Sequence, residues 1–219
     1  MPTLPLALTL LAAASAALTV RAEHRQARRA VYLFKPLTTV LILALAATAP
    51  QPAGRGYQAL VCAGLLFSLA GDVFLMLPRD RFVAGLASFL AAHLLYVAAF
   101  APRPPALAAP LVLAALVAYG GVLLRALWPR LGSLRAPVAL YAAALLVMAW
   151  QAAERWMTLD TAPALLAAAG AGLFVVSDSV LAWQRFRGRH AYGQAVMLST
   201  YFAAQWLIAS SVSTSPFGG

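Results

Sequence analysis

The stretch Leu66–Pro78, LFSLAGDVFLMLP, places an aspartate, Asp72, in the middle of an apolar run. None of the five residues on either side of Asp72 is basic, so nothing nearby in the sequence neutralises it. A second aspartate, Asp178, is equally isolated in GLFVVSDSVLAW (172–183). The chain has only six acidic residues, so two of them in long apolar runs direct attention to the environment of those runs.

Composition identifies that environment as lipid. The chain has 219 residues, of which 63% are hydrophobic and 10% charged, with a mean hydropathy of +0.82. Soluble proteins carry about 25% charged residues. Backbone groups in lipid must be satisfied within their own segment, which favours helices, and the apolar runs lack the alternation of a transmembrane barrel. We therefore expect an all-α polytopic membrane protein with one membrane-embedded domain, residues 1–219.

About 20 residues are needed to cross the hydrocarbon core. Breaks at charged, proline and glycine residues predict eight such helices, at 4–21, 34–49, 57–77, 82–101, 106–127, 135–152, 162–184 and 192–212. The first segment lacks the positively charged start of a signal peptide, which favours an uncleaved helix.

Basic residues predict the orientation, because they are retained on the cytoplasmic side. Only three of the sixteen, Arg55, Arg103 and Arg155, fall in the even connections of the eight-helix pattern. The other thirteen fall in the odd connections and the adjoining helix ends, so we expect both termini outside, on the periplasmic face of a bacterial inner membrane. The net charge of +10 then reflects topology and anionic headgroups, and no nucleic-acid partner is expected.

An ionisable residue at membrane depth costs about 2.5–3.5 kcal/mol to insert and usually marks a functional site. Counting residues to the cytoplasmic ends of their helices places Asp72 and Asp178 at matched depths of roughly 9 and 10 Å. Other polar residues are expected near the same layer: Lys35, at the start of its helix with Pro36 in the first turn, and His93, Tyr96, Tyr119, Tyr141 and Ser177.

Structural explanations compete with these functional ones. Either aspartate could pair with Lys35 or an arginine and simply hold helices together, His93 could be a core residue, and the tyrosines could be packing residues. Glu154 and Asp160 are expected in a solvated outer loop. One histidine and two aspartates are too few to indicate a zinc site, no GxSxG elbow is present, and no cofactor is expected.

Four ordered motifs carry a family resemblance: KP at 35–36, LFSLAGDVFLML at 66–77, FVAGLASFLAAHLLYVAAF at 82–100, and GAGLFVVSDSVLAWQRF at 170–186. Together they resemble the YhhN-like membrane family, whose characterised members are lysoplasmalogenases. The resemblance implies a lysophospholipid substrate in a membrane, with hydrolysis of the vinyl-ether bond of 1-alkenyl lysophospholipids to a fatty aldehyde and a glycerophospho-head group.

The aspartates suit that chemistry. Vinyl-ether hydrolysis begins with protonation of the β-carbon, which gives an oxocarbenium ion that water then attacks. A low-dielectric site favours a protonated carboxyl group, and a second carboxylate can stabilise the cation and activate water. We expect Asp178 to be the acid and Asp72 to activate water. Lys35 would meet the substrate phosphate, and His93, Tyr96 and Tyr141 would orient water or the ether oxygen, with the chain arriving from the cytoplasmic leaflet.

Two other classes of function remain open from the sequence. A small proton-coupled transporter could use Asp72 and Asp178 as a relay, although the helices lack the paired midplane Gly/Pro breaks of broken-helix transporters. A non-catalytic lipid-binding protein would show altered stability, rather than altered turnover, when either aspartate becomes asparagine. The oligomeric state is not indicated by the sequence.

Overall fold

The computed structural model describes residues 3–101, 107–188 and 190–214. Within these ranges the chain forms eight α-helices and two short 3-10 helices, and the only β-type pairing is an isolated bridge between Pro52 and Ser213. The helices are α1 (Thr3–His24), α2 (Arg28–Ala47), α3 (Arg55–Met76), α4 (Phe82–Phe100), α5 (Pro110–Leu127), η1 (Trp128–Arg130), η2 (Gly132–Leu134), α6 (Arg135–Leu159), α7 (Ala162–Phe186) and α8 (Gly193–Ser210).

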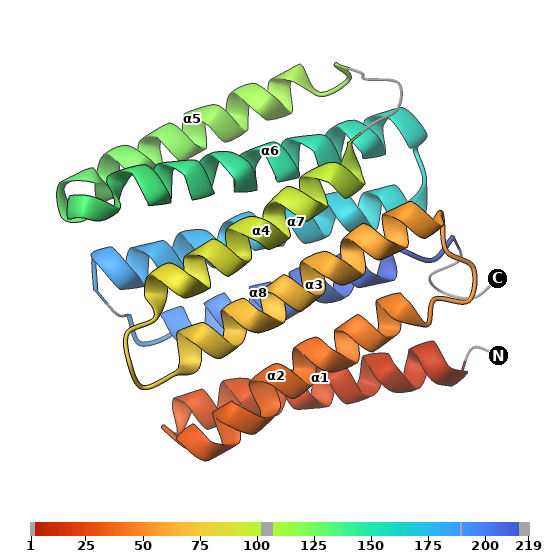
Figure 1. Ribbon diagram of the computed structural model, residues 1–219. Coiled ribbons are helices and arrows are strands. Elements are labelled where there is room, and N and C mark those ends of the chain that lie inside the picture. The colour runs from red at the N-terminus through yellow and green to blue at the C-terminus, as the bar shows by residue number, and fades with distance from the viewer. Residues whose placement is uncertain (1–2, 102–106, 189, 215–219) are drawn as a thin grey trace.

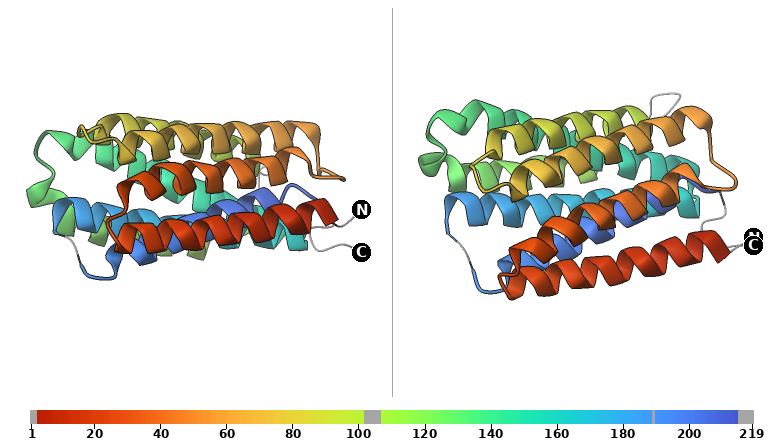
Figure 2. Two further views of the ribbon diagram at one scale, coloured as in Figure 1. Left: turned by 90° about the horizontal axis from the view of Figure 1, so that it is seen from below. Right: turned by 60° about the horizontal axis from the view of Figure 1, so that its bottom comes forward.

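The helices run up and down along a common axis in one elongated bundle (Figures 1 and 2). Helices α3, α4, α6, α7 and α8 form its centre, while α1 packs on α2 and α8 at one edge and α5 packs on α6 and α7 at the other. Helix α1 begins and α8 ends at the same end of the bundle. The expected all-α class and the presence of eight α-helices are therefore confirmed for the described residues, whereas the crossing of the membrane by all eight, with both termini outside, stays a prediction.

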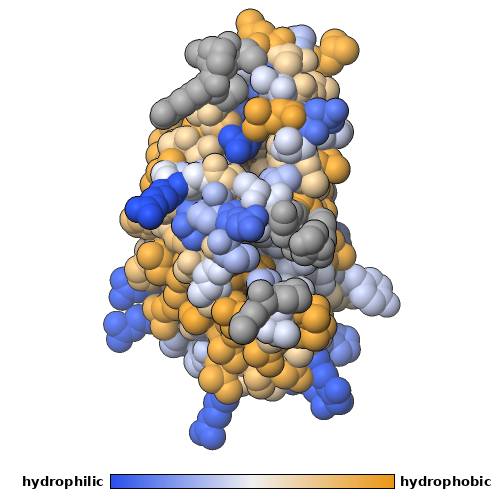
Figure 3. Space-filling view, turned by 90° about the vertical axis from the view of Figure 1, so that its right-hand side faces the viewer, coloured by the Kyte–Doolittle hydropathy of each residue, from blue (hydrophilic) through white to orange (hydrophobic). Residues whose placement is uncertain are grey.

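Seven of these helices are long and apolar enough to cross a membrane, and α8 is not among the seven. Figure 3 shows the bundle end at which α1 begins, where a small central group of hydrophilic residues is surrounded by a mostly hydrophobic surface. Large exposed apolar side chains continue along the outer helices, for example Leu10 on α1 and Leu111 and Val122 on α5. This distribution is that of a protein whose lateral surface faces lipid.

Some helix boundaries differ from the expected ones by several residues, the largest differences being those of α2 and α6. Helix α2 begins at Arg28 rather than at residue 34, so Pro36 lies inside the helix and not in its first turn. Helix α6 continues to Leu159 rather than ending at residue 152. Both extensions add charged residues, Arg28 and Arg29 in α2 and Glu154 and Arg155 in α6, which interrupt the apolar runs of the sequence. The expected start of the fifth helix, residue 106, lies outside the described residues. The same holds for Arg103 and Arg189, two of the basic residues that predict the orientation.

The expectation that Glu154 is a solvated loop residue is wrong. Its side chain is only 1% exposed and lies within α6. The carboxylate accepts hydrogen bonds from the backbone N–H groups of Ala108 and Ala109, at 2.7 and 2.8 Å, and from Trp150 Nε1 at 3.1 Å. It thereby neutralises the N-terminus of α5, where unsatisfied N–H groups favour a negative charge.

Close contact between α3 and α4 sets the position of Asp72. A Cβ atom on Gly71 would lie 2.6 Å from the Phe89 ring, and one on Gly64 would overlap the Tyr96 ring. Small residues at helix interfaces allow such close approach in membranes. The absence of a side chain at Gly71 therefore permits close packing of α3 on α4, and it places the adjoining Asp72 in the bundle interior.

Candidate active site

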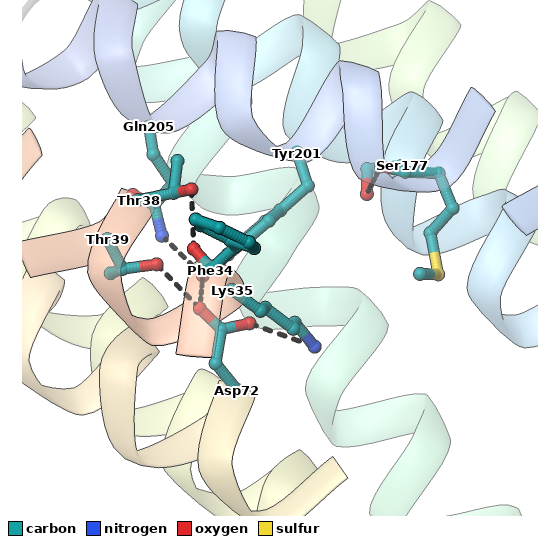
Figure 4. Close-up of polar contacts among 9 residues, drawn as sticks. Phe34, Lys35, Thr38, Thr39, Asp72, Ser177, Tyr201 and Gln205 are labelled. Atoms are coloured by element: carbon teal, nitrogen blue, oxygen red, sulfur yellow. Dashed lines mark hydrogen bonds and ion pairs between the residues drawn. The ribbon is translucent and has the colours of Figure 1, made fainter. Parts of the chain in front are cut away.

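Asp72 is the centre of a buried polar cluster formed by α2, α3 and α8 (Figure 4). Its side chain is 1% exposed, and its Oδ1 lies 3.2 Å from Lys35 Nζ. Its Oδ2 accepts hydrogen bonds from Thr39 Oγ1 and from the Tyr201 hydroxyl, both at 2.7 Å. One cation and two hydroxyl donors compensate the negative charge, as a buried carboxylate requires.

A chain of hydrogen bonds links this cluster to Gln205 and Tyr96. Gln205 donates from Nε2 to the Tyr201 hydroxyl at 3.3 Å, and its Oε1 accepts from the Tyr96 hydroxyl at 2.9 Å. Tyr201 and Gln205 are four residues apart on α8, so both side chains lie on one helix face. Tyr96 is thus linked to Asp72 indirectly, through two side chains of α8.

Asp178 lies in a second and less polar environment, on α7. The Tyr141 hydroxyl of α6 donates to its Oδ2 at 2.5 Å, and His93 Nε2 of α4 lies 3.9 Å from the same oxygen, beyond hydrogen-bonding distance. The His93 side chain is fully buried, and neither ring nitrogen has a hydrogen-bond partner among the described residues. The ring instead packs edge-on against Tyr141 and Phe174, with centroids 5.1 and 4.8 Å apart.

An aromatic layer separates the two carboxylates. The Phe89 and Phe174 rings pack edge-on against each other and against Tyr201, the hydrogen-bond donor to Asp72. Phe174 also contacts His93 on the Asp178 side. The two aspartates therefore have separate hydrogen-bond partners. Tyr201, which binds Asp72, and His93, which lies near Asp178, both pack against Phe174.

Two cavities of opposite polarity approach the aspartates from the end of the bundle where α3 joins α4. One is a polar vestibule of about 620 Å³ whose lining includes Lys35 and several arginines. The other is a narrow apolar pocket of about 60 Å³ among α3 to α7, with Asp178 and Tyr141 in its wall. Leu75, Phe82 and Leu181 line both cavities, so the vestibule and the apolar pocket adjoin.

The remaining candidate residues lie at the margin of this arrangement. Ser177 donates to the Met197 carbonyl of α8 at 2.9 Å and lies apart from the Asp72 cluster (Figure 4). The Tyr119 hydroxyl donates to Ser179 Oγ at 2.7 Å, and its half-exposed ring lines the apolar pocket.

Sequence reasoning missed Thr39, Tyr201 and Gln205. The TT after Lys35-Pro36 and the four-residue spacing of Tyr201 and Gln205 were the available signals.

Charged groups at the mouth of the vestibule form a third pair. Arg185 Nη2 donates to Asp80 Oδ2 at 2.6 Å, and the Phe82 backbone N–H donates to Asp80 Oδ1 at 3.1 Å. The hydrogen bond from Arg185, with that from Phe82, holds the pKa of the Asp80 carboxyl below its ordinary value. Within the described residues no group of three or more His, Cys, Asp and Glu side chains has the arrangement of a metal site.

Apolar helices around buried, partnered carboxylates define a polytopic membrane protein with an internal polar site. Residues 30–212 match the YhhN family. An uncharacterized membrane protein YhhN of Escherichia coli O6:H1 is 39% identical over 199 residues, covering 90% of this chain and 94% of that protein. The lysoplasmalogenases TMEM86B of Sus scrofa and Homo sapiens are 39% and 38% identical, covering 75% and 76% of this chain and 68% of each relative. No solved structure matches the chain. The chain belongs to the YhhN family.

Proposed function

We propose that the protein hydrolyses the vinyl-ether bond of 1-alkenyl lysophospholipids, in the inner membrane of a bacterium. The observation that carries this proposal is the junction of the polar vestibule and the apolar pocket, with Asp178 in the wall of the pocket and Lys35, the partner of Asp72, in the wall of the vestibule. A single-chain phospholipid has one polar and one apolar end, and its vinyl-ether bond lies where the two meet. The relatives named lysoplasmalogenase support the same substrate class.

Asp178 is the general acid in this proposal. It lies in the wall of the apolar pocket, where desolvation favours a neutral carboxyl group. Its Oδ2 is held by Tyr141, and this orients Oδ1 for proton transfer. The proton passes from Asp178 to the β-carbon of the alkenyl chain, and the positive charge develops on the α-carbon and the ether oxygen.

Water completes the reaction. It adds to the α-carbon of the oxocarbenium ion and loses a proton, and the resulting hemiacetal collapses to a fatty aldehyde and the free hydroxyl of the glycerophospho-head group. His93, with both ring nitrogens free of partners among the described residues, is suited to orient this water. Each turnover thus consumes one water, and the proton donated by Asp178 is restored from it.

Asp72 is the ionised member of the pair. Lys35, Thr39 and Tyr201 together stabilise its negative charge, so it supplies a fixed negative charge that stabilises the oxocarbenium ion from the other side of the aromatic layer, while His93 orients the attacking water. Lys35 lines the vestibule as well. Its ammonium is engaged by Asp72, and its principal role in this scheme is to keep that carboxylate charged.

The test is aldehyde release from a defined 1-alkenyl lysophospholipid by the purified protein, with the 1-acyl analogue as the substrate control. We expect aldehyde from the alkenyl lipid alone. Asp178→Asn and Asp72→Asn should each lower kcat by about 10²-fold or more, since general acid–base groups contribute roughly 10²–10⁴-fold. Asp160→Asn, a change to an exposed acidic residue at the far end of α6, is the matched control and should retain full activity.

Two results would count against the proposal. Folded wild-type protein that releases no aldehyde would remove the hydrolase assignment and favour proton-coupled transport. Variants of Asp72 and Asp178 that lose thermal stability but keep full turnover would assign both carboxylates to structure.

A further inference from the structure

The polar vestibule carries more positive charge than its internal pairs neutralise. Five basic side chains line it against two acidic ones, Glu23 and Asp80. Lys35 is paired with Asp72 and Arg185 with Asp80. The three basic residues left, Arg28, Arg79 and Arg81, form no ion pair with any described residue.

The Arg185–Asp80 pair fixes which arginines are available. Both Asp80 oxygens are already engaged, Oδ2 by Arg185 Nη2 at 2.6 Å and Oδ1 by the Phe82 backbone N–H at 3.1 Å. Asp80 therefore does not neutralise its chain neighbours Arg79 and Arg81. Gln184 also lines the vestibule, and its buried Nε2 has no hydrogen-bond partner among the described residues.

The basic residues lie where the two cavities meet. Phe82 lines both cavities and directly follows Arg81 in the chain. The Arg185 guanidinium carbon lies 4.7 Å from the centre of the Phe82 ring. An anion held by the vestibule arginines would consequently sit beside the mouth of the apolar pocket.

We propose that the vestibule is the phosphate-binding subsite for a single-chain phospholipid, with Arg79 and Arg81 as the phosphate ligands and the first carbons of the hydrocarbon chain at the apolar pocket. This inference rests on the proposed function for the identity of the lipid. It assigns phosphate recognition to the loop between α3 and α4, and not to Lys35, whose charge is already compensated by Asp72. Guanidinium groups suit the role because their donors match phosphate oxygens.

The test measures binding and does not require turnover. A saturated 1-O-alkyl lysophosphocholine, which cannot be cleaved by vinyl-ether protonation, is compared with the corresponding 1-O-alkylglycerol, which lacks the phosphate. Binding is followed by the quenching of tryptophan fluorescence in nanodiscs of neutral lipid. We expect the wild type to bind the phosphate-bearing lipid at least tenfold more tightly than the alkylglycerol.

The variant Arg79→Gln/Arg81→Gln should lose about tenfold in affinity for the lysophosphocholine and bind the alkylglycerol unchanged. Arg130→Gln, which removes an exposed arginine that does not line the vestibule, is the matched control and should bind both lipids as the wild type does. Equal losses in the double variant and in Arg130→Gln would assign the effect to general surface charge. Unchanged binding by the double variant would also overturn the proposal.

Competition separates a lipid headgroup from free phosphate. Soluble glycerophosphocholine should displace the lysophosphocholine at concentrations where inorganic phosphate does not. Equal displacement by both would show a simple anion site and would contradict the headgroup assignment. Arginine-dependent binding without aldehyde release from the alkenyl substrate would support the vestibule subsite while removing the hydrolase function, so the two proposals can fail separately.

Discussion

Removal of the Lys35 charge is the sharpest test of how Asp72 is held. In Lys35→Met the apolar stem of the side chain is retained, but the carboxylate loses its cation at 3.2 Å. At an effective dielectric constant of about 20, the attraction across that distance is about 5 kcal/mol. Breaking a buried ion pair by removing one partner costs about 3–5 kcal/mol in other proteins. We expect a loss of stability in this range, because Thr39 and Tyr201 still donate hydrogen bonds to the carboxylate in the variant.

For a chain of this length, such a loss corresponds to a fall of roughly 10 °C in Tm. The single cysteine provides the readout, because Cys62 lies partly buried on α3, the helix that carries Asp72. Its reaction with a thiol-reactive fluorophore during heating reports the opening of that helix. Circular dichroism on the same samples serves as an independent measure.

The compensating variant Lys35→Met/Asp72→Asn removes both charges and should recover most of the lost stability, since replacing a buried pair by neutral groups is often close to neutral. A single variant Lys35→Met as stable as the wild type would refute the reasoning. It would show that Asp72 is already protonated in the folded protein and that the ion pair contributes nothing.

Two further predictions concern packing and capping. Glu154→Gln should lower stability by about 1–3 kcal/mol, because a buried backbone donor of Ala108 or Ala109 loses its charged acceptor. Thermal unfolding measures this loss. Unchanged aldehyde release would show that the effect is confined to the end of the bundle remote from Asp178. Gly71→Ala should cost about 1–3 kcal/mol by overpacking, because its new methyl group would displace Phe89, and it should also lower turnover. Gly172→Ala, with open space around its Cβ position, is the control and should be neutral or slightly stabilising, so equal losses in both would contradict the packing argument.

Much of the architecture was predictable from composition and spacing. Lipid as the solvent requires helices, the hydrocarbon thickness fixes their length, and these two constraints produced eight segments that the structure contains. Boundaries failed where charged residues extend a helix, as with Arg28 in α2 and Glu154 in α6. Hydropathy places such residues outside the membrane, because it does not represent partners such as the backbone N–H groups of Ala108 and Ala109 that accommodate Glu154.

The candidate site was only partly predictable. An isolated aspartate in an apolar run can be recognised from the sequence alone. Its insertion into the membrane is costly and therefore requires a compensating partner. The identity of that partner depends on which helices adjoin. The adjacency of α2, α3 and α8 joins Lys35, Thr39 and Tyr201 to Asp72, although Tyr201 is 129 residues away from it in the chain.

The sequence by itself determined that this chain is a helical membrane protein and that Asp72 and Asp178 are its unusual groups, because both conclusions follow from the cost of placing backbone and charge in lipid. Only the tertiary structure decided that the two carboxylates differ. Asp72 is compensated by a lysine and two hydroxyl groups, whereas Asp178 has one tyrosine and an apolar pocket. That difference depends on helix packing, which brings together side chains that no local pattern relates.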